Sequence, residues 1–214
     1  IKSLFFCICI QIILIIFKKY FFNYMIIIDY GLGNLASIHN MLKQIGSEPV
    51  ISDDYDLILN SKDLILPGVG NFEKGIQNLR AKSLDKAIIK ACKNKARLLG
   101  ICLGMHLLFD KSEEGKSSGL GLVEGQVKKF RFTNNEFKVP HMGWNNVKFS
   151  EQSKLNFVYK EKHKFYFAHS FYVECVNTEN EVGTTNYGFK FTSSIEKKNI
   201  YGVQFHPEKS HNFG

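Results

Sequence analysis

Several patterns that mark common classes of protein are missing from these 214 residues. No CxxC pair, HxH group or HExxH group is present, which excludes a zinc ribbon and a zinc protease. A GxxxxGK(S/T) segment is also missing, and Gly31-Leu32-Gly33 lacks the third glycine of a dinucleotide fingerprint. We therefore expect neither a metal ion nor a cofactor.

Cysteine is scarce, since five widely spaced residues cannot form a disulfide scaffold. An odd number of thiols fits a reducing compartment and predicts a cytoplasmic protein. Hydrophobic residues make up 44% of the chain and charged residues 22%, which is typical of a globular domain. A chain of this length can bury a core without cross-links.

Basic residues outnumber acidic residues, but their distribution along the chain does not indicate nucleic-acid binding. The net charge is +8, of which residues 1–24 contribute three lysines, leaving +5. The surplus is mostly lysine in polar segments, such as Lys86, Lys90 and Lys93. No RNA- or DNA-binding motif accompanies it, so we interpret these lysines as a solvated surface.

The one long apolar run, residues 4–17, lies near the N-terminus and is broken only by Gln11. It is short of the roughly 20 residues that a membrane span needs, and no small-residue cleavage site follows. Met25 then opens a buried-strand pattern. We interpret Met25 as the natural start and residues 1–24 as upstream sequence outside the fold. A short membrane anchor and a signal peptide are the alternatives.

From Met25 onward, strand and helix patterns alternate, which predicts an open, largely parallel α/β sheet flanked by helices. The predicted strands are 25–30, 48–52, 63–66 and 96–101, and the predicted helices are 35–45, 72–80, 84–93 and 105–110. Short runs separated by turns then predict added antiparallel strands in the C-terminal half. These runs are 124–130, 145–149, 166–176, 181–187, 190–196 and 200–206. Residues 25–214 are therefore expected to form one domain.

A possible nucleophile follows the fourth predicted strand, in Gly100-Ile101-Cys102-Leu103-Gly104. A strand, a Gly-x-Cys-x-Gly turn and a helix form the cysteine version of the nucleophile elbow. The N-terminus of a helix favours a thiolate over a thiol. A buried structural cysteine is the alternative.

Two other segments could complete an acyl-transfer site. His206-Pro207-Glu208 follows the last predicted strand. An imidazole there could move protons, and a carboxylate beside it could fix its orientation. Pro67-Gly68-Val69-Gly70 follows the third strand and could turn backbone N–H groups toward an oxyanion, although Pro-Gly pairs also mark ordinary turns.

Together these motifs resemble the class I (triad) glutamine amidotransferases, over residues 25–214. Within them the sequence resembles the HisH family, the glutaminase subunits of imidazole glycerol phosphate synthase. The cysteine elbow and the HPE segment mark only the superfamily, whereas IDYGLGN and PHMGWN narrow the resemblance to HisH. The matching segments are 28–34, 67–72, 100–105, 140–145, 169–172 and 204–210.

The resemblance implies a flavodoxin-like fold and a Cys-His-Glu triad. Cys102 would attack the side-chain amide of glutamine, His206 would transfer the protons, and Glu208 would orient His206. The implied oxyanion and substrate-binding residues are Gly68, Val69, Gly70, Leu103, His106, Ser170 and Phe171.

The resemblance also implies a partner, a HisF-like (β/α)8 cyclase subunit through which the ammonia passes. There it would react with a phosphorylated ribulosyl nucleotide in histidine synthesis. The segment with the only tryptophan is the candidate docking face, with a core tryptophan as the alternative. The implied interface residues are His141, Met142, Trp144 and Asn145.

Two features depart from the family pattern. The position four residues after the nucleophile is usually Gln, and His106 stands there, with one donor and one acceptor when neutral. Family chains also carry a closing helix beyond the position of Gly214, so this domain is expected to lack its last helix.

Three alternatives remain at this point. One is a paralogous glutaminase subunit that supplies ammonia to a surface-sugar amidotransferase. Another is a catalytically silent interaction subunit of the same fold, against which the intact Cys102, His206 and Glu208 argue. The third is a membrane-tethered protein, which rests only on residues 4–17.

Overall fold

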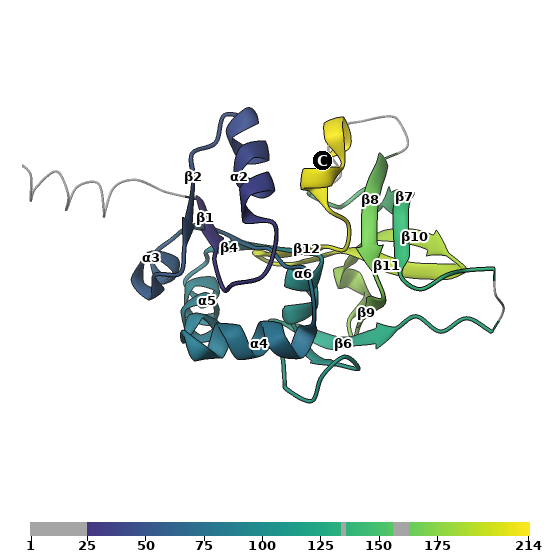
Figure 1. Cartoon of the computed structure of the whole chain (residues 1–214), viewed down its shortest axis with the longest axis horizontal. Helices are drawn as coiled ribbons and strands as arrows, with labels where there is room; N and C mark the ends of the chain where they lie inside the picture. The colour runs from purple at the N-terminus through teal and green to yellow at the C-terminus, as the bar shows by residue number, and fades with distance from the viewer. Residues whose placement is uncertain (1–24, 134–135, 156–162) are drawn as a thin grey trace, which may run out of the picture.

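The computed structural model describes residues 25–133, 136–155 and 163–214, so the predicted leader lies outside it. Four strands of the N-terminal half and β12 near the C-terminus form a parallel sheet, in the order β2-β1-β3-β4-β12 (Figure 1). The strands are β1 (Met25–Ile28), β2 (Pro49–Ser52), β3 (Asp63–Leu66), β4 (Arg97–Ile101) and β12 (Ile200–Val203). Among the described helices, none has the length and apolar character to cross a membrane.

Helices cover both faces of this sheet because its central strands are apolar on both sides. Ile27 packs with the residues of α2 on one face, while Ile26 and Ile28 belong to the core on the other face. Figure 1 shows α2 on one side and α3, α4 and α5 on the other. The helices are α2 (Leu35–Gln44), α3 (Tyr55–Leu59), α4 (Phe72–Ala81), α5 (Leu84–Lys93) and α6 (Leu103–Leu107).

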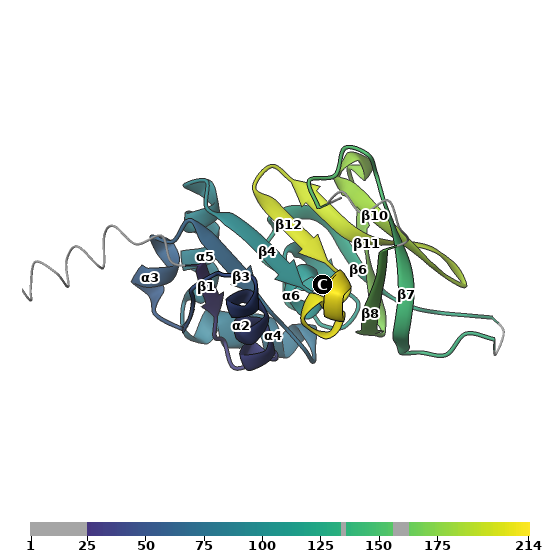
Figure 2. The same cartoon turned by 90° about the horizontal axis from the view of Figure 1, so that it is seen from above.

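Antiparallel strands extend the sheet beyond β12, through β11, β10, β7 and β8 (Figure 2). Strand β9 pairs with both β11 and β6, and β5 runs parallel to β6. The strands are β5 (Phe109–Ser112), β6 (Val123–Lys129), β7 (His141–Phe149), β8 (His163–His169), β9 (Phe171–Cys175), β10 (Glu181–Tyr187) and β11 (Phe189–Lys197). Three 3-10 turns complete the described elements: η1 (Thr178–Asn180), η2 (Pro207–Lys209) and η3 (His211–Phe213).

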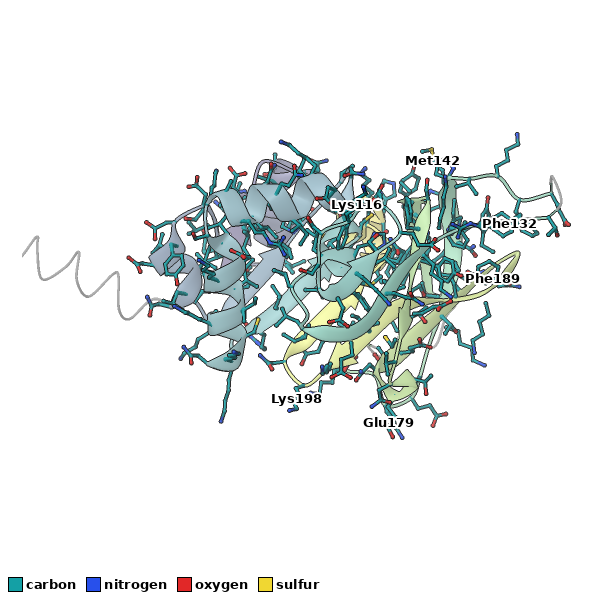
Figure 3. The ribbon with its side chains drawn as sticks, turned by 90° about the horizontal axis from the view of Figure 1, so that it is seen from below. Lys116, Phe132, Met142, Glu179, Phe189 and Lys198 are labelled. Atoms are coloured by element: carbon teal, nitrogen blue, oxygen red, sulfur yellow. The ribbon has the colours of Figure 1, made fainter. Side chains whose placement is uncertain are left out.

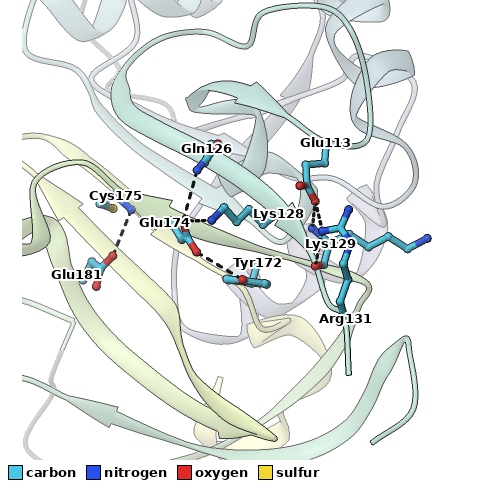
Figure 4. A network of polar contacts seen from close by, with 9 residues as sticks. All are labelled: Glu113, Gln126, Lys128, Lys129, Arg131, Tyr172, Glu174, Cys175 and Glu181. Atoms are coloured by element: carbon cyan, nitrogen blue, oxygen red, sulfur yellow. Dashed lines mark hydrogen bonds and ion pairs between the residues drawn. The ribbon is translucent and has the colours of Figure 1, made fainter. Parts of the chain in front are cut away.

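Polar contacts on the surface tie β9 to its neighbours (Figure 4). Lys128 Nζ lies 2.8 Å from Glu174 Oε2, which links β6 to β9. The backbone N–H of Cys175 donates to Glu181 Oε1 at 3.2 Å, which links β9 to β10. The Lys128–Glu174 ion pair is partly exposed to solvent, so it adds little to the stability of the domain.

The predicted order of elements is confirmed, except that strand β5 and helix α3 were not predicted and several bounds are corrected. The predicted single strand 166–176 is broken at Ser170 into β8 and β9. The strand predicted over 200–206 ends at Val203 and pairs in parallel with β4, as well as antiparallel with β11. The last predicted helix is α6, which begins at Leu103 and ends at Leu107, because Phe109 already pairs with Val123.

Another correction is a helix that was not predicted from the sequence. Helix α3 has only five residues, too few for helical periodicity to be visible. Its signal was the N-cap, since Asp54 Oδ1 accepts from the N–H of Leu57 at 2.8 Å. Helix α2 is capped in the same way, because Asn34 Oδ1 accepts from the N–H of Ser37 at 3.4 Å.

Candidate active site

The predicted strand–turn–helix around Cys102 is present, with β4 before it and α6 after it. Cys102 has φ 53° and ψ −110°, an unfavourable backbone conformation for a residue with a side chain. Its N–H donates to Val203 O at 2.8 Å, which anchors the elbow to β12. A Cβ on Gly104 would overlap Leu66 O, so the turn closes only because glycine stands there.

His206 and Glu208 form a buried pair beside this cysteine. The distance between His206 Nδ1 and Glu208 Oε1 is 2.8 Å, and their side chains are 2% and 1% exposed. Burial by itself would lower the pKa of His206, but hydrogen bonds to Cys102 and Glu208 outweigh it and raise that pKa to about 9. The imidazole is therefore protonated at neutral pH, next to the sulfur.

The sulfur of Cys102 opens onto a cavity of about 180 Å³. Six of the seven residues predicted for the oxyanion and substrate line it, together with others from β7, β8 and the loop after β5. The lining residues are Val69, Gly70, Cys102, Leu103, His106, Glu114, Pro140, Met142, Ala168, His169, Ser170 and Phe171.

Gly68, the seventh predicted residue, does not line this cavity but lies buried beneath it. A Cβ on Gly68 would stand 2.5 Å from the Tyr30 hydroxyl oxygen and 2.8 Å from Leu103 Cβ. The Tyr30 hydroxyl donates to Pro67 O at 2.6 Å, and Tyr30 is buried. Gly68 and Tyr30 thus hold the glycine loop against the elbow, which leaves Val69 and Gly70 at the cavity.

Several residues at the site were missed from the sequence, among them the lining residues Pro140, Ala168 and His169. Tyr30 is another, and it carried no signal beyond its place in a matching segment. Glu114, in the loop after β5, was also not predicted. Gln204 could have been found, because it lies two residues before His206 at the end of a strand, where alternate side chains share a face. Its Nε2 lies 3.8 Å from the sulfur of Cys102.

Two further buried histidines, His169 in the cavity wall and His141 next to it, form a chain of hydrogen bonds. The Phe171 carbonyl can only accept, so His169 donates from Nδ1 at 2.7 Å. His169 Nε2 is then the acceptor for the Nδ1–H of His141 at 2.9 Å. Asn145 Nδ2 donates in turn to His141 Nε2 at 3.3 Å. The chain joins β7 to the first residue of β9, which lines the cavity.

The four residues predicted for a partner interface therefore divide into two pairs. His141 is 3% exposed and Asn145 is part-buried, so their side chains support the fold beneath the surface. Met142 is 65% and Trp144 40% exposed, so Trp144 is not a core residue. Figure 3 shows Met142 at the outer edge of the molecule, away from the ribbon.

No metal site emerges from the described part of the chain, because no three His, Cys, Asp or Glu side chains gather there as ligands. Cys102, which lines the cavity, instead lies beside the buried pair of His206 and Glu208, neither of which lines the cavity itself. This set can carry out nucleophilic acyl transfer, with proton transfer by the imidazole.

The buried histidines predict a stability maximum near neutral pH. Burial holds the pKa of His106 and His141 at about 4 and that of His169 well below 6.5. Between pH 6.5 and 4 the unfolded chain binds protons that the folded chain does not, so the free energy of unfolding falls as pH falls. His206 acts oppositely, since its raised pKa gives stability that is lost as pH rises from 6.5 through about 9.

Urea unfolding from pH 4.5 to 9 would measure this curve. On the acid side each buried histidine is expected to contribute up to about 1.4 kcal/mol per pH unit. The His106→Gln chain should therefore lose about a third of the histidine contribution to that slope. A free energy of unfolding that is flat from pH 6.5 to 4.5 would contradict the expectation.

The profile of the class-I glutamine amidotransferase family matches residues 26–213, nearly all of the described chain. This chain belongs to that family. Its relatives within the family include HisH proteins. It is 52% identical to imidazole glycerol phosphate synthase subunit HisH 2 of Methanococcus maripaludis, over 88% of this chain and 93% of that protein. It is 44% identical to the HisH subunit of Sulfurimonas denitrificans, over 88% and 92% of the two chains.

Solved structures agree with this class-I glutamine amidotransferase fold. A glutamine amidotransferase crystal structure superposes with a TM-score of 0.67 at 16% identity, over 86% of this chain and 90% of the other. PurLQS from Thermotoga maritima gives 0.68 at 20% identity, over 89% and 91%. At these identities they establish the fold alone. The HisH relatives favour a glutaminase subunit over the paralogue of surface-sugar metabolism.

Proposed function

We propose that this amidotransferase hydrolyses glutamine with Cys102 as nucleophile, His206 as acid and base, and Glu208 as the group that orients His206. The observation that carries the proposal is the buried His206–Glu208 pair beside the sulfur of a strained elbow. The products are glutamate and ammonia. The ammonia is passed to a HisF-like cyclase subunit, for imidazole glycerol phosphate synthesis in histidine biosynthesis.

Acylation begins when the thiolate of Cys102 attacks the side-chain carbonyl carbon of glutamine. As the C–S bond forms, the carbonyl oxygen takes up the negative charge. Leu103 is the first residue of α6, so its N–H has no acceptor within the helix and is available to that oxygen, as are the N–H groups of Val69 and Gly70. Protonated His206 then gives its proton to the amide nitrogen, and ammonia leaves as the C–N bond breaks.

Deacylation uses the same groups in the reverse order. Neutral His206 takes a proton from a water molecule, whose oxygen attacks the thioester carbon. The C–S bond breaks, glutamate leaves, and the sulfur returns as thiolate beside the protonated ring. Glu208 accepts from Nδ1 throughout, so the other ring nitrogen always faces the reaction.

The cavity also offers a partner for the substrate's α-ammonium group. Glu114 contributes a carboxylate to the lining, with Ser170 across the cavity as a further polar group. Burial raises the pKa of Glu114, although its Oε2 accepts from the N–H of Phe72 at 2.8 Å. An arriving ammonium ion would favour the charged carboxylate.

Exposed apolar side chains at the cavity support a docking face for the cyclase. Met142 and Val69 both line the cavity and are 65% and 46% exposed, and Trp144 lies on the same strand as Met142. A partner seated there would cover apolar surface and close the exit of the ammonia. The unpaired thiols of the described cysteines support a reducing compartment, so we place the enzyme in the cytoplasm.

The decisive experiment measures glutamate release from glutamine, with and without the cognate cyclase subunit and its phosphorylated ribulosyl nucleotide. We expect release that rises when the cyclase is present and that is absent from the Cys102→Ala chain. Trp144→Ala is expected to weaken cyclase binding by about tenfold, because aromatic anchors dominate interface energies. Val176→Ala is the matched control. Val176 is 74% exposed and follows the last residue of β9, at the opposite end of that strand from the cavity residue Phe171.

Two results would count against the proposal in different ways. If the cyclase binds and no glutamate appears, the assignment of Cys102, His206 and Glu208 fails. If glutamate is released but the cyclase does not bind, the ammonia goes to another acceptor, and the surface-sugar amidotransferase becomes the next to test.

A further inference from the structure

A buried polar contact next to the nucleophile takes no part in the mechanism above. Cys102 and His106 lie one helical turn apart, and Gln204 follows β12. Gln204 is fully buried and His106 is 4% exposed. His106 Nε2 lies 2.7 Å from Gln204 Oε1, and Gln204 Nε2 lies 3.8 Å from the Cys102 sulfur.

The chemistry of the amide fixes the direction of both contacts. An amide oxygen can only accept, so the hydrogen of the first contact sits on His106 Nε2. The ring is neutral near pH 7, because burial holds the pKa of His106 at about 4. The amide of Gln204 therefore turns its NH2 group, a donor only, toward the sulfur.

His106 decides which end of the amide meets the nucleophile. If the Gln204 amide rotated by half a turn, its oxygen would lie against the thiolate and its NH2 group against the N–H of His106. Both contacts would then be repulsive, whereas both are favourable in the observed orientation. A donor near a thiolate stabilises the charged form of the sulfur.

We propose that Gln204 donates to the Cys102 thiolate, and that His106 is a positioning residue that acts through Gln204 rather than on the substrate glutamine. The inference rests on the proposed nucleophile. It gives His106, which stands where the family usually has Gln, a role in stabilising the Cys102 thiolate. The cavity would then hold its substrate through other groups, with His106 as part of the wall.

Alkylation of Cys102 by iodoacetamide as a function of pH tests this inference. Mass spectrometry of the Cys102 peptide follows this cysteine alone in the full chain, with no glutamine and no cyclase present. Gln204→Leu is expected to move the alkylation midpoint up by about one pH unit, because a hydrogen bond to a charged group is lost. His106→Leu should move it in the same direction, since the amide is then free to turn.

The double variant distinguishes positioning from two independent effects. If His106 acts through Gln204, the pair together should shift the midpoint no further than Gln204→Leu alone. His106→Gln retains a donor for the amide oxygen and should leave the midpoint near that of the unchanged chain. Thr185→Val is the control for loss of a buried hydrogen bond elsewhere, since Thr185 is 2% exposed and donates to Ser193 Oγ at 2.8 Å.

The contrary result is equally clear. A His106→Leu chain whose alkylation midpoint is unchanged and whose KM for glutamine alone rises would place His106 on the substrate and overturn the inference. An unshifted midpoint in Gln204→Leu would do the same. Should that chain not fold, Gln204→Met keeps the length of the side chain and loses the donor without adding a charge, so an upward shift is again expected. Apart from this comparison of KM, the results come from alkylation alone and need no glutaminase assay, so failure of the proposed function would be seen separately.

Discussion

Replacing Glu208 with glutamine is expected to reduce glutamate release by about 10²–10⁴-fold, and replacing Cys102 with alanine should leave only the uncatalysed background. The Glu208 carboxylate accepts from His206 Nδ1, and both side chains are shielded from water. An amide can present its NH2 group to that nitrogen, which would favour the ring tautomer with its proton on the wrong side. The charge that stabilises the imidazolium would also be lost.

The pH dependence of the remaining activity separates this effect from simple misfolding. The pKa of His206 is raised partly by Glu208, so the alkaline limb of kcat should move to lower pH in Glu208→Gln. Glu179→Gln is the matched control, because Glu179 is exposed in η1, far from Met142 and the cavity (Figure 3). Full activity in Glu208→Gln would remove the carboxylate from the triad.

Replacing Gly104 with alanine is expected to destabilise the domain by about 3–5 kcal/mol, which is near the whole stability of many domains. The backbone of Gly104 is not in a left-handed conformation, so its role is space alone. A Cβ there would overlap the carbonyl oxygen of Leu66, the last residue of β3. Because that atom belongs to a central strand, it cannot move aside as a side chain could.

Gly46→Ala gives the comparison for this prediction. A Cβ on Gly46 meets nothing within 4 Å, and its φ of 82° is the only obstacle. We expect a loss of about 1 kcal/mol there, since a left-handed conformation is mildly unfavourable for alanine. Urea unfolding of both chains would measure the difference. Equal stability of Gly104→Ala and the unchanged chain would show that β3 and α6 lie farther apart than they do in this structure.

The elements were predictable where local pattern and long-range structure agree. Strand β3 and helix α5 have the predicted bounds, because an apolar pattern and clear turn residues mark both ends. The bounds failed where a distant partner decides them. Phe109 could continue a helix by its own preference, but it pairs with Val123 and ends α6 after one turn. The parallel pairing of β12 with β4 likewise depends on strands a hundred residues apart.

The candidate site was predictable as a set of residues but not as an arrangement. Cys102, His206 and Glu208 stand in short segments whose chemistry is visible without a structure. The sequence did not show that Gln204 faces the sulfur or that Glu114 faces the cavity, because each comes from a different segment. It also grouped His141 with Met142, although neighbours on a strand point to opposite sides.

The sequence by itself determined the alternation of strands and helices, the glycine elbow and the three residues that we propose for catalysis, because each is written in a few consecutive residues. Only the tertiary structure decided the rest. It placed β12 against β4, which brings His206 to Cys102, and it buried His106, His141 and His169 so that they stay neutral. Pairing across the sheet and burial depend on the whole chain, and no short segment encodes them.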